Sequence, residues 1–246
     1  TRVSNGRRIG VCAFQAGPGI ENAFPGVAQA YADSTPILVL PGQAGMQRQG
    51  LPTNFDAVAN YRGVTKWAAQ VNAPGRIPEL VRRAFTCLRT GRPGPVLLEL
   101  PQDIMNGEVD EAASHYKPAR GSRPSGDPKD VADAVRALLS AKCPLIHVGQ
   151  GVLYAEATAE LLEFAELVQA PVMTTTLAKG AFPENHPLSI GTGGNTGTKM
   201  VGHFFKEADL VFSIGASMSK TLMSAPIPPG KVAVQCTVDE KDINSE

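Results

Sequence analysis

Two glycines on either side of a proline open the segment whose residue types best suit close contact with a ligand. Gly17, Pro18 and Gly19 follow an apolar run and lead into a helical pattern, in the stretch AFQAGPGIENAFPG at residues 13–26. Glycine lets the backbone approach a ligand, and the first amide groups of a helix have no partner within it. Asn22 adds an amide that can both donate and accept. By itself, such a turn is more typical of a plain connection between a strand and a helix.

Glycine turns in the second half of the chain form another candidate site, for a ligand that carries phosphate. The stretch GTGGNTGTKM, residues 191–200, comes just before a helical pattern, and SIGASMSK, residues 213–220, ends an apolar run. Backbone amides at such positions can bind a diphosphate. The spacing is not that of the GxGxxG motif, and tight turns that bind nothing explain it equally well. The candidate nucleotide-site residues are Gly193, Gly194, Gly197, Thr198, Gly215 and Asp239.

Charge and composition argue against several classes of partner. The chain has 23 basic and 23 acidic residues and no basic stripe, which disfavours a nucleic acid partner. No apolar run approaches the ~20 residues of a membrane-spanning helix, so no membrane partner is expected. The histidine, aspartate and serine residues show no triad spacing, and no set of metal ligands is indicated.

The cysteines indicate a reducing compartment. Cys12, Cys87, Cys143 and Cys236 lie far apart and show no CxxC or Cys/His spacing. We interpret them as buried free thiols, and the protein as cytoplasmic.

The elements that must hold these residues follow the pattern of an α/β protein. Short β-branched runs alternate with helical patterns, which predicts two doubly wound, mostly parallel sheets. Because Pro25 conflicts with a helix interior, the helix after the glycine turn is expected to begin near it or to be kinked there. Glu99 is interpreted as an exposed strand end rather than as a catalytic acid. In the first half, strands are expected at residues 8–14, 35–43, 61–71 and 95–101.

A polar stretch rich in proline, glycine and serine divides the chain. It predicts a linker at residues 107–126 between one domain at residues 1–106 and another at residues 127–246. The second domain begins with a helix, for which Asp127 is the expected N-cap with Pro128 at the first position. The apolar face of that helix is expected to consist of Val131, Val135, Leu138 and Leu139.

Several motifs in one order resemble a known family. The stretch GVCAFQAGPGIENAFPGVAQAYADSTPILVLPGQ is similar to thiamine-diphosphate enzymes of the acetolactate synthase type, where a strand runs into a TSGPGATN-like turn and a later strand ends in GQ. VTKW and TGRPGPVLLELPQDI match further segments, and GAFPENHPLSIG, EADLVFSIGAS and VDEKDIN match the family's central domain. The resemblance implies that residues 1–106 are the later part of a pyrimidine-binding domain. It implies that residues 127–246 form a Rossmann-like central domain.

The resemblance gives the turn around Pro18 a role. It implies that the turn holds the aminopyrimidine ring of thiamine diphosphate, and that Pro18, Asn22 and Gln43 touch the ring. The implied activity is decarboxylation or carboligation of 2-oxo acids or related carbonyl compounds, with Mg²⁺ as a second cofactor. The family also implies a homodimer or homotetramer, in which the cofactor sits between subunits. The residues assigned to the pyrimidine side are Gln15, Gly17, Pro18, Gly19, Asn22 and Gln43.

Two functional segments of the family do not occur in this sequence. In the family, a glutamate upstream of the turn protonates the aminopyrimidine, and a GDG…N segment in a third domain binds the diphosphate and Mg²⁺. Glu21 lies on the wrong motif to be the missing acid. We therefore expect this chain to be a fragment of a longer protein, inactive by itself, and we assign no catalytic residue to it.

Flavin binding depends on two further positions. Acetolactate synthases bind FAD on the central domain, with arginines among the contacts, and here Ser217 and Leu80 stand at two of those positions. Losing charge-assisted contacts weakens the binding of phosphate groups. We therefore expect no tightly bound FAD, and either an ADP-like nucleotide or an empty site instead.

A different class of function stays open at this point. The two domains can also be a non-catalytic module that binds a nucleotide or a partner. A reading frame that continues into both missing segments favours the enzyme, whereas a natural chain of this length favours the binding module. The sequence does not identify the substrate.

Overall fold

The computed structural model describes residues 1–246 except 111–115, 123, 195–196, 220–223, 225–226 and 244–246. The chain folds into two compact units, Thr1–Arg123 and Pro124–Glu246, which divide within the stretch that the sequence marks as a linker. Each unit contains a parallel sheet with helices interleaved between its strands. The prediction of an α/β fold with two doubly wound parallel sheets is confirmed. The limits of the linker itself stay a prediction.

The first unit is built on a four-stranded sheet in the order β1-β2-β4-β3. All its described strand pairings are parallel. The strands are β1 (Gly10–Phe14), β2 (Ile37–Gln43), β3 (Trp67–Gln70) and β4 (Val96–Pro101). The α-helices are α1 (Pro18–Ala32), α2 (Ala57–Tyr61), α3 (Ile77–Arg89) and α4 (Gln102–Met105). Short 3-10 helices cover Arg2–Ser4, Met46–Arg48, Arg62–Val64 and Pro74–Arg76.

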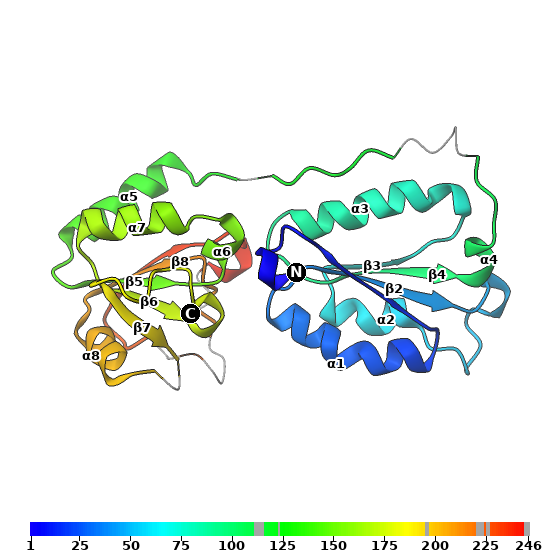
Figure 1. Cartoon of the computed structure of the whole chain (residues 1–246), viewed down its shortest axis with the longest axis horizontal. Helices are drawn as coiled ribbons and strands as arrows, with labels where there is room; N and C mark the ends of the chain where they lie inside the picture. Colours follow the sequence, from blue (N-terminus) through cyan, green and yellow to red (C-terminus); the bar gives the residue numbers. More distant parts are fainter. Residues whose placement is uncertain (111–115, 123, 195–196, 220–223, 225–226, 244–246) are drawn as a thin grey trace. The chain divides into compact units, whose positions relative to one another are not determined.

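Alternating side chains of this sheet are buried on opposite faces. Leu97 of β4 belongs to the cluster that contains Ile20 of α1 and Tyr61 of α2. Leu98, the next residue, belongs instead to the cluster that contains Leu80 of α3. Figure 1 shows α3 on one side of the sheet and α1 with α2 on the other. The apolar run of β4 is therefore covered on both faces, as its lack of alternation predicts.

The expected start of the first long helix near Pro25 is wrong, and the alternative expectation, a kink at Pro25, stays a prediction. α1 begins at Pro18 and continues through Pro25 to Ala32. Pro18 is the first residue of the helix, where a backbone N–H would have no acceptor within the helix, so the missing N–H of proline costs no hydrogen bond. Pro25 removes the donor for the carbonyl of Glu21, but both residues are exposed, so that water can satisfy this carbonyl.

The strand expected at residues 61–71 is wrong in its first half. Tyr61 ends helix α2, and the strand begins only at Trp67. Asp56 caps α2, because its Oδ1 accepts a hydrogen bond from the backbone N–H of Ala59 at 2.8 Å. Tyr61 is fully buried, and its hydroxyl donates to the carbonyl of Ile20 in α1. Burial raises the pKa of Tyr61 to about 12.

The second unit contains a five-stranded sheet in the order β7-β6-β5-β8-β9, with parallel pairings between its neighbours. Its strands are β5 (Pro144–Val148), β6 (Val172–Thr175), β7 (Ser189–Gly193), β8 (Leu210–Ile214) and β9 (Val232–Cys236). Its α-helices are α5 (Pro128–Ser140), α6 (Gly151–Ala155), α7 (Thr158–Val168) and α8 (Lys199–Glu207). Two 3-10 helices cover Thr176–Ala178 and Glu240–Asp242.

The core of the second unit also lies on both faces of its sheet. Ile146 of β5 packs in a cluster with Leu161 of α7. Leu145, which precedes it, packs in another cluster with Val201 and Phe205 of α8. Figure 1 shows α5 and α7 on one side of this sheet and α8 on the other. The carboxyl ends of all five strands therefore share one edge of the sheet between two helical layers.

Helix α5 has the expected cap but not the expected buried face. Asp127 is its N-cap, and its Oδ1 accepts from the backbone N–H of Lys129 at 2.8 Å. Of the four predicted core residues only Leu138 is buried, whereas Val131, Val135 and Leu139 are exposed. Helical periodicity identifies which side of a helix is apolar, but it does not determine whether another element covers that side.

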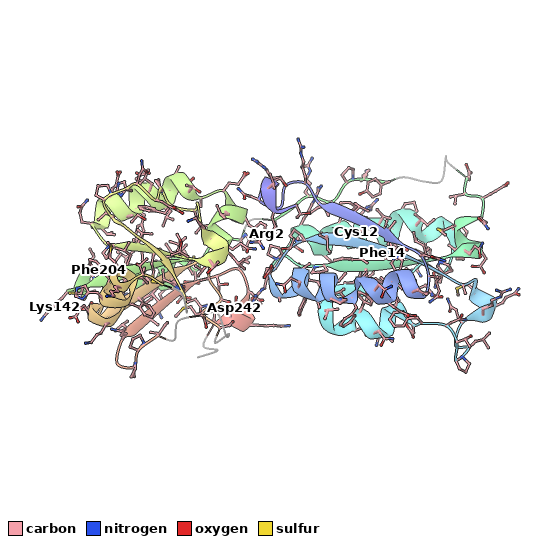
Figure 2. All side chains as sticks on the ribbon, turned by 60° about the horizontal axis from the view of Figure 1, so that its bottom comes forward. Arg2, Cys12, Phe14, Lys142, Phe204 and Asp242 are labelled. Carbon is pink, nitrogen blue, oxygen red and sulfur yellow. The ribbon has the colours of Figure 1, made fainter. Side chains whose placement is uncertain are left out.

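The prediction of buried cysteines is wrong, because none of the four is fully buried. Cys143 and Cys236 are exposed, whereas Cys12 and Cys87 are partly buried, and all four are free thiols. Cys12 lies on the edge strand β1 (Figure 2). The residue before it on this strand, Val11, is exposed. Among the described residues, no cluster of three or more histidine, cysteine, aspartate or glutamate side chains is arranged to hold a metal ion. None of the described helices has the length and apolar character needed to span a bilayer.

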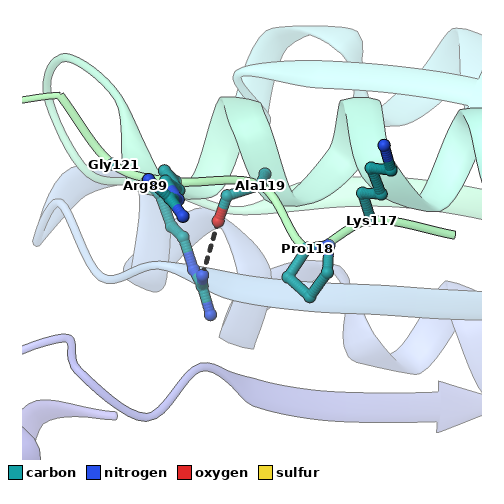
Figure 3. A pocket seen from close by; sticks show the side chains of 6 residues that line it. Arg89, Lys117, Pro118, Ala119 and Gly121 are labelled. Carbon is teal, nitrogen blue, oxygen red and sulfur yellow. Dashed lines mark hydrogen bonds between the residues drawn. The ribbon is translucent and has the colours of Figure 1, made fainter.

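A shallow basic hollow lies at the end of α3 (Figure 3). Arg89, Lys117 and Arg120 are among its lining residues, and Arg89 Nη1 donates to the carbonyl of Ala119 at 2.7 Å. Because α3 returns from the carboxyl end of β3 to the amino end of β4, this hollow belongs to the amino edge of the sheet. It is therefore separate from the strand ends that carry the predicted cofactor residues.

Candidate functional site

The parallel pairing of β1 and β2 brings the glycine turn and Gln43 to one edge of the first sheet. Phe14, the last residue of β1, is aligned with Pro41 of β2. A Cβ atom on Gly42 would lie 3.7 Å from the carbonyl oxygen of Phe14 and 3.8 Å from the amide nitrogen of Ala16. The end of β2 therefore lies directly against the start of the turn. The carboxyl edge of a parallel sheet is where ligands of such folds bind.

The turn requires both of its glycines for local reasons. Gly17 has a φ of +65°, in the left-handed region that side chains disfavour. A Cβ atom on Gly19 would lie 3.0 Å from Cβ of Gln15, so the first turn of α1 packs tightly on the end of β1. The backbone N–H of Ile20 donates to the carbonyl of Gln15 at 3.1 Å, which closes the turn.

The polar side chains of this turn face outward. Gln15, Pro18 and Asn22 are exposed, and within the described part of the chain the amides of Gln15 and Asn22 form no hydrogen bond. Pro18 and Asn22 are four residues apart on α1 and hence lie on one side of the helix. These free amides beside close backbone match what a flat, polar heterocycle needs. The residues present therefore fit the aminopyrimidine ring.

Gln43 differs from these residues because neighbouring groups hold its side chain. Its Nε2 donates to the carbonyl of Phe55 at 2.8 Å and to Oε1 of Glu99 at 3.0 Å. Its Oε1 accepts from the backbone N–H of Ala44 at 2.8 Å. The amide of Gln43 is thus fixed in one orientation, and Gln43 is a partly exposed residue at the end of β2.

Glu99 is the residue that sequence reasoning missed. It was expected to be an exposed residue at the end of a strand, and this expectation is wrong. The side chain is only 2% exposed. Its Oε2 accepts from Nε2 of Gln70 at 2.5 Å, so that one carboxylate joins an amide from β2 and an amide from β3. The available signal was the uninterrupted apolar run of β4, which indicates burial of every residue in it, including the charged one.

The surroundings of Glu99 act on its pKa in opposite directions. Burial raises the pKa, and the negative charge of Asp56 raises it further. Hydrogen bonds from Gln70, Gln43 and the backbone N–H of Ala57 lower it, but burial dominates and the net shift is upward. All three of these partners donate to the carboxylate, which is the pattern that stabilises its ionised form.

In the second unit, the candidate nucleotide residues share a sheet edge but do not form one cluster. Gly193 ends the edge strand β7. Gly215 follows β8, which lies three strands further along the sheet. At about 4.8 Å per strand, this places the two strand ends roughly 14 Å apart. Asp239 follows β9, the opposite edge strand. A ligand that contacted all of them would have to extend across the whole edge.

Local packing already accounts for several of these residues. A Cβ atom on Gly193 would lie 2.2 Å from Cε of Met173. The backbone N–H of Gly215 donates to the carbonyl of Cys236 at 2.8 Å, which leaves this N–H unavailable to a phosphate.

The other candidate nucleotide residues also have hydrogen bonds within the protein. Thr198 is the N-cap of α8, since its Oγ1 accepts from the N–H of Val201 at 3.3 Å. Gly197 donates to the carbonyl of Gly194 at 3.0 Å across residues 195–196, which lie outside the described part. Asp239 accepts at Oδ1 from the N–H of Lys241 at 3.1 Å.

The two positions singled out for the flavin question lie in different units. Leu80 is 4% exposed on the buried face of α3 in the core of the first unit, so this position offers no contact to a ligand. Ser217 follows β8 in the second unit, and its Oγ accepts from the hydroxyl of Ser219 at 3.0 Å. Nucleotide binding by the second unit stays a prediction.

Comparison with known protein families shows to which family this chain belongs. The profile "Thiamine pyrophosphate enzyme, N-terminal TPP binding domain" matches residues 1–70, and "Thiamine pyrophosphate enzyme, central domain" matches residues 131–246. The chain belongs to the thiamine pyrophosphate enzymes. Within this family, residues 1–70 carry the turn with Asn22 and the strand end with Gln43, and the second match covers most of the second unit.

Curated relatives from this thiamine pyrophosphate enzyme family match most of the chain. A probable acetolactate synthase large subunit of Methanocaldococcus jannaschii is 39% identical over 218 residues, which are 85% of this chain and 37% of the relative. The acetolactate synthase large subunit of Corynebacterium glutamicum is 38% identical over 215 residues, 85% of this chain and 34% of the relative. A glyoxylate carboligase of Escherichia coli O157:H7 is 36% identical over 219 residues, 87% of this chain and 37% of the relative. The chain thus spans less than two fifths of the length of these relatives.

Proposed function

We propose that this chain supplies the pyrimidine side of the cofactor site in a thiamine-diphosphate carboligase or decarboxylase that acts on small 2-oxo acids. The observation that carries the proposal is the meeting of the turn around Pro18 with Gln43 at the carboxyl edge of one parallel sheet. The similarity to acetolactate synthases and to a glyoxylate carboligase supports it. Glyoxylate, which the last of these names contains, is itself a 2-oxo acid.

The geometry supports a role for each of this chain's proposed site residues. Pro18 and Asn22 present one face of α1 to the ring, Gln15 adds a free amide, and Gln43 adds a fixed one. When bound, thiamine diphosphate supplies stabilisation of the carbanion that decarboxylation generates. The part of the site described here binds and orients the cofactor, and the proton-transferring acid and the diphosphate anchor belong to other parts of the whole protein.

The same proposal includes the finer features that the family resemblance implies. Mg²⁺ accompanies the diphosphate, the whole protein is a homodimer or homotetramer, and it works in the cytoplasm. The second unit binds an ADP-like nucleotide or nothing rather than FAD. The isolated chain is inactive.

Replacing Asn22 by alanine is expected to weaken thiamine diphosphate binding to the intact protein about tenfold, because one hydrogen bond from a ring-facing amide is lost. Isothermal titration with the cofactor and Mg²⁺ measures this change. Gln29→Ala is the matched control, because Gln29 is also exposed two turns further along α1, and its side-chain amide forms no hydrogen bond within the described part. This control is expected to bind as tightly as the wild type.

The competing hypothesis, a non-catalytic binding module, gives a different result in the same preparation. The proposed enzyme releases CO₂ from a 2-oxo acid such as pyruvate or glyoxylate when thiamine diphosphate and Mg²⁺ are present. An intact protein that binds no thiamine diphosphate and releases no CO₂, with Asn22→Ala indistinguishable from wild type, would favour the binding module.

A further inference from the structure

Three polar side chains from three neighbouring strands meet at the carboxyl edge of the first sheet. Gln43 comes from β2, Glu99 from β4 and Gln70 from β3, and β4 lies between the other two strands. Glu99 Oε1 accepts from Gln43, and Glu99 Oε2 accepts from Gln70. An acidic residue that is 2% exposed is costly in a protein interior, so its presence between two amides calls for a reason.

We propose that Glu99 is a positioning residue that holds the amide of Gln43 so that only its carbonyl oxygen is offered to the cofactor. The inference rests on the proposed function, in which Gln43 faces the aminopyrimidine ring. The group that Gln43 recognises is then a hydrogen-bond donor. On the ring, that donor is the exocyclic amine.

The hydrogen bonds of Gln43 set this polarity. An ionised carboxylate only accepts, so Glu99 can pair with the NH₂ end of the amide and not with its oxygen. The carbonyl of Phe55 takes the other hydrogen of the same nitrogen at 2.8 Å. Both donors of Gln43 are therefore used within the protein. Among the residues that the structure describes, its oxygen accepts one bond, from Ala44, which leaves one lone pair for a ligand.

Glu99 supplies the contact that makes the orientation rigid. Phe55 and Ala44 each contribute one bond through the backbone of segments outside the strands, whereas Glu99 lies in the middle of three paired strands. Gln70 occupies the second carboxylate oxygen, which prevents Glu99 from turning away. The pair Glu99 and Gln70 thus acts on the cofactor only through Gln43.

The test compares two variants of the intact protein that differ only at Glu99. Gln70→Met removes the outer amide and keeps the bond between Glu99 and Gln43. The double variant with Glu99→Met and Gln70→Met also removes the carboxylate, and it leaves no orphaned polar partner at position 70, although the backbone N–H of Ala57 loses its acceptor together with Gln43. Glu99→Gln is the conservative variant, because Gln70 can rotate to face its amide while its oxygen still accepts from Gln43.

The first readout is discrimination between thiamine diphosphate and the analogue in which a carbonyl oxygen replaces the exocyclic amine. Wild type, Gln70→Met and Glu99→Gln are expected to prefer the amine by the same factor. In the double variant this preference is expected to fall about fivefold, since Gln43 is then free to rotate and donate. If the double variant binds both compounds less tightly by equal factors, Glu99 has only a structural role and the inference is overturned. Loss of the preference in Glu99→Gln would also overturn it.

The second readout needs no cofactor. In the free protein, the side-chain NH₂ of Gln43 is expected to exchange with solvent several-fold faster in the double variant than in Gln70→Met, as measured by NMR of the ¹⁵N-labelled amide. Equal exchange rates in the two would overturn the positioning role. If exchange is slower in Gln70→Met than in the double variant but the wild type binds no thiamine diphosphate, then the proposed function fails and the assignment of the amine fails with it, while the positioning of Gln43 by Glu99 stands.

Discussion

Gly149→Ala is expected to destabilise the second unit by about 4 kcal/mol, which is a large share of the roughly 5–15 kcal/mol that stabilises a typical domain. A Cβ atom on Gly149 would lie 2.2 Å from the carbonyl oxygen of Gly215 and 2.4 Å from Cα of Ala216. Both are backbone atoms of the turn after β8, so no side-chain rotation relieves the clash. The hydrogen bonds from Gly149 to Ile214 at 2.8 Å and from Gly151 to Gly215 at 2.9 Å hold the two turns at this separation.

Gly202→Ala is the matched control in the same unit. Gly202 lies inside α8 and is exposed, and a Cβ atom on it would meet nothing within 4 Å outside its own helix. Alanine there is expected to raise the unfolding free energy by about 0.5–1 kcal/mol, because glycine is a poor helix former. The protein's single tryptophan, Trp67, lies in the first unit, so hydrogen exchange of the β5 and β8 amides is the appropriate measurement. Wild-type protection of these amides in Gly149→Ala would contradict the prediction.

The glycines of the second unit show where sequence reasoning about ligand sites is ambiguous. A glycine at a strand end indicates that something approaches the backbone closely, and a ligand and another loop give the same signal. Around Gly149, Gly151 and Gly215 the approaching group is the neighbouring turn of the same sheet. In the turn that contains Gly17, by contrast, open space remains beside the glycine, and the described atom nearest to a Cβ placed there is the end of the Glu21 side chain, at 4.0 Å.

The fold was predictable because its signals are local. Alternation of short apolar runs with helical patterns indicates parallel sheets, and the cap at Asp127 is visible in the sequence. The exposed stripe of Val131, Val135 and Leu139 was not predictable, because burial depends on which elements lie next to α5. The start of β3 at Trp67 was missed for a similar reason, since Tyr61 reaches the core from a short capped helix.

The candidate site was predictable as a set of strand ends but not as a network. The turn before α1 and Gln43 were recognisable from their motifs, and strand order places them together. The link from Gln43 to Glu99 joins residues 56 positions apart on neighbouring strands. Only the register of β4 against β2 and β3 shows that the carboxylate lies between two amides.

His147 makes the second unit sensitive to acid. Its ring lies largely buried in β5, where Nδ1 is 3.2 Å from Oγ of Ser213 on the adjacent strand β8. Burial lowers the pKa of His147 to about 4. In the unfolded chain a histidine has a pKa of about 6.5, so between these two values the unfolded state binds a proton that the folded state does not. The stability that comes from keeping His147 neutral is therefore present in full above about pH 6.5 and is lost as the pH falls toward 4.

The loss is expected to reach up to about 3 kcal/mol, since each pKa unit of difference corresponds to about 1.4 kcal/mol and part of the ring remains accessible. Urea denaturation of the second unit at pH 7.5 and pH 4.5 measures it. His147→Gln retains a polar group beside Ser213 but does not titrate, so it is expected to lose less stability between these pH values than the wild type does. His203→Gln, at an exposed position on α8, is expected to lose as much as the wild type. If acid destabilises His147→Gln as much as the wild type, then a group other than His147 causes the acid sensitivity.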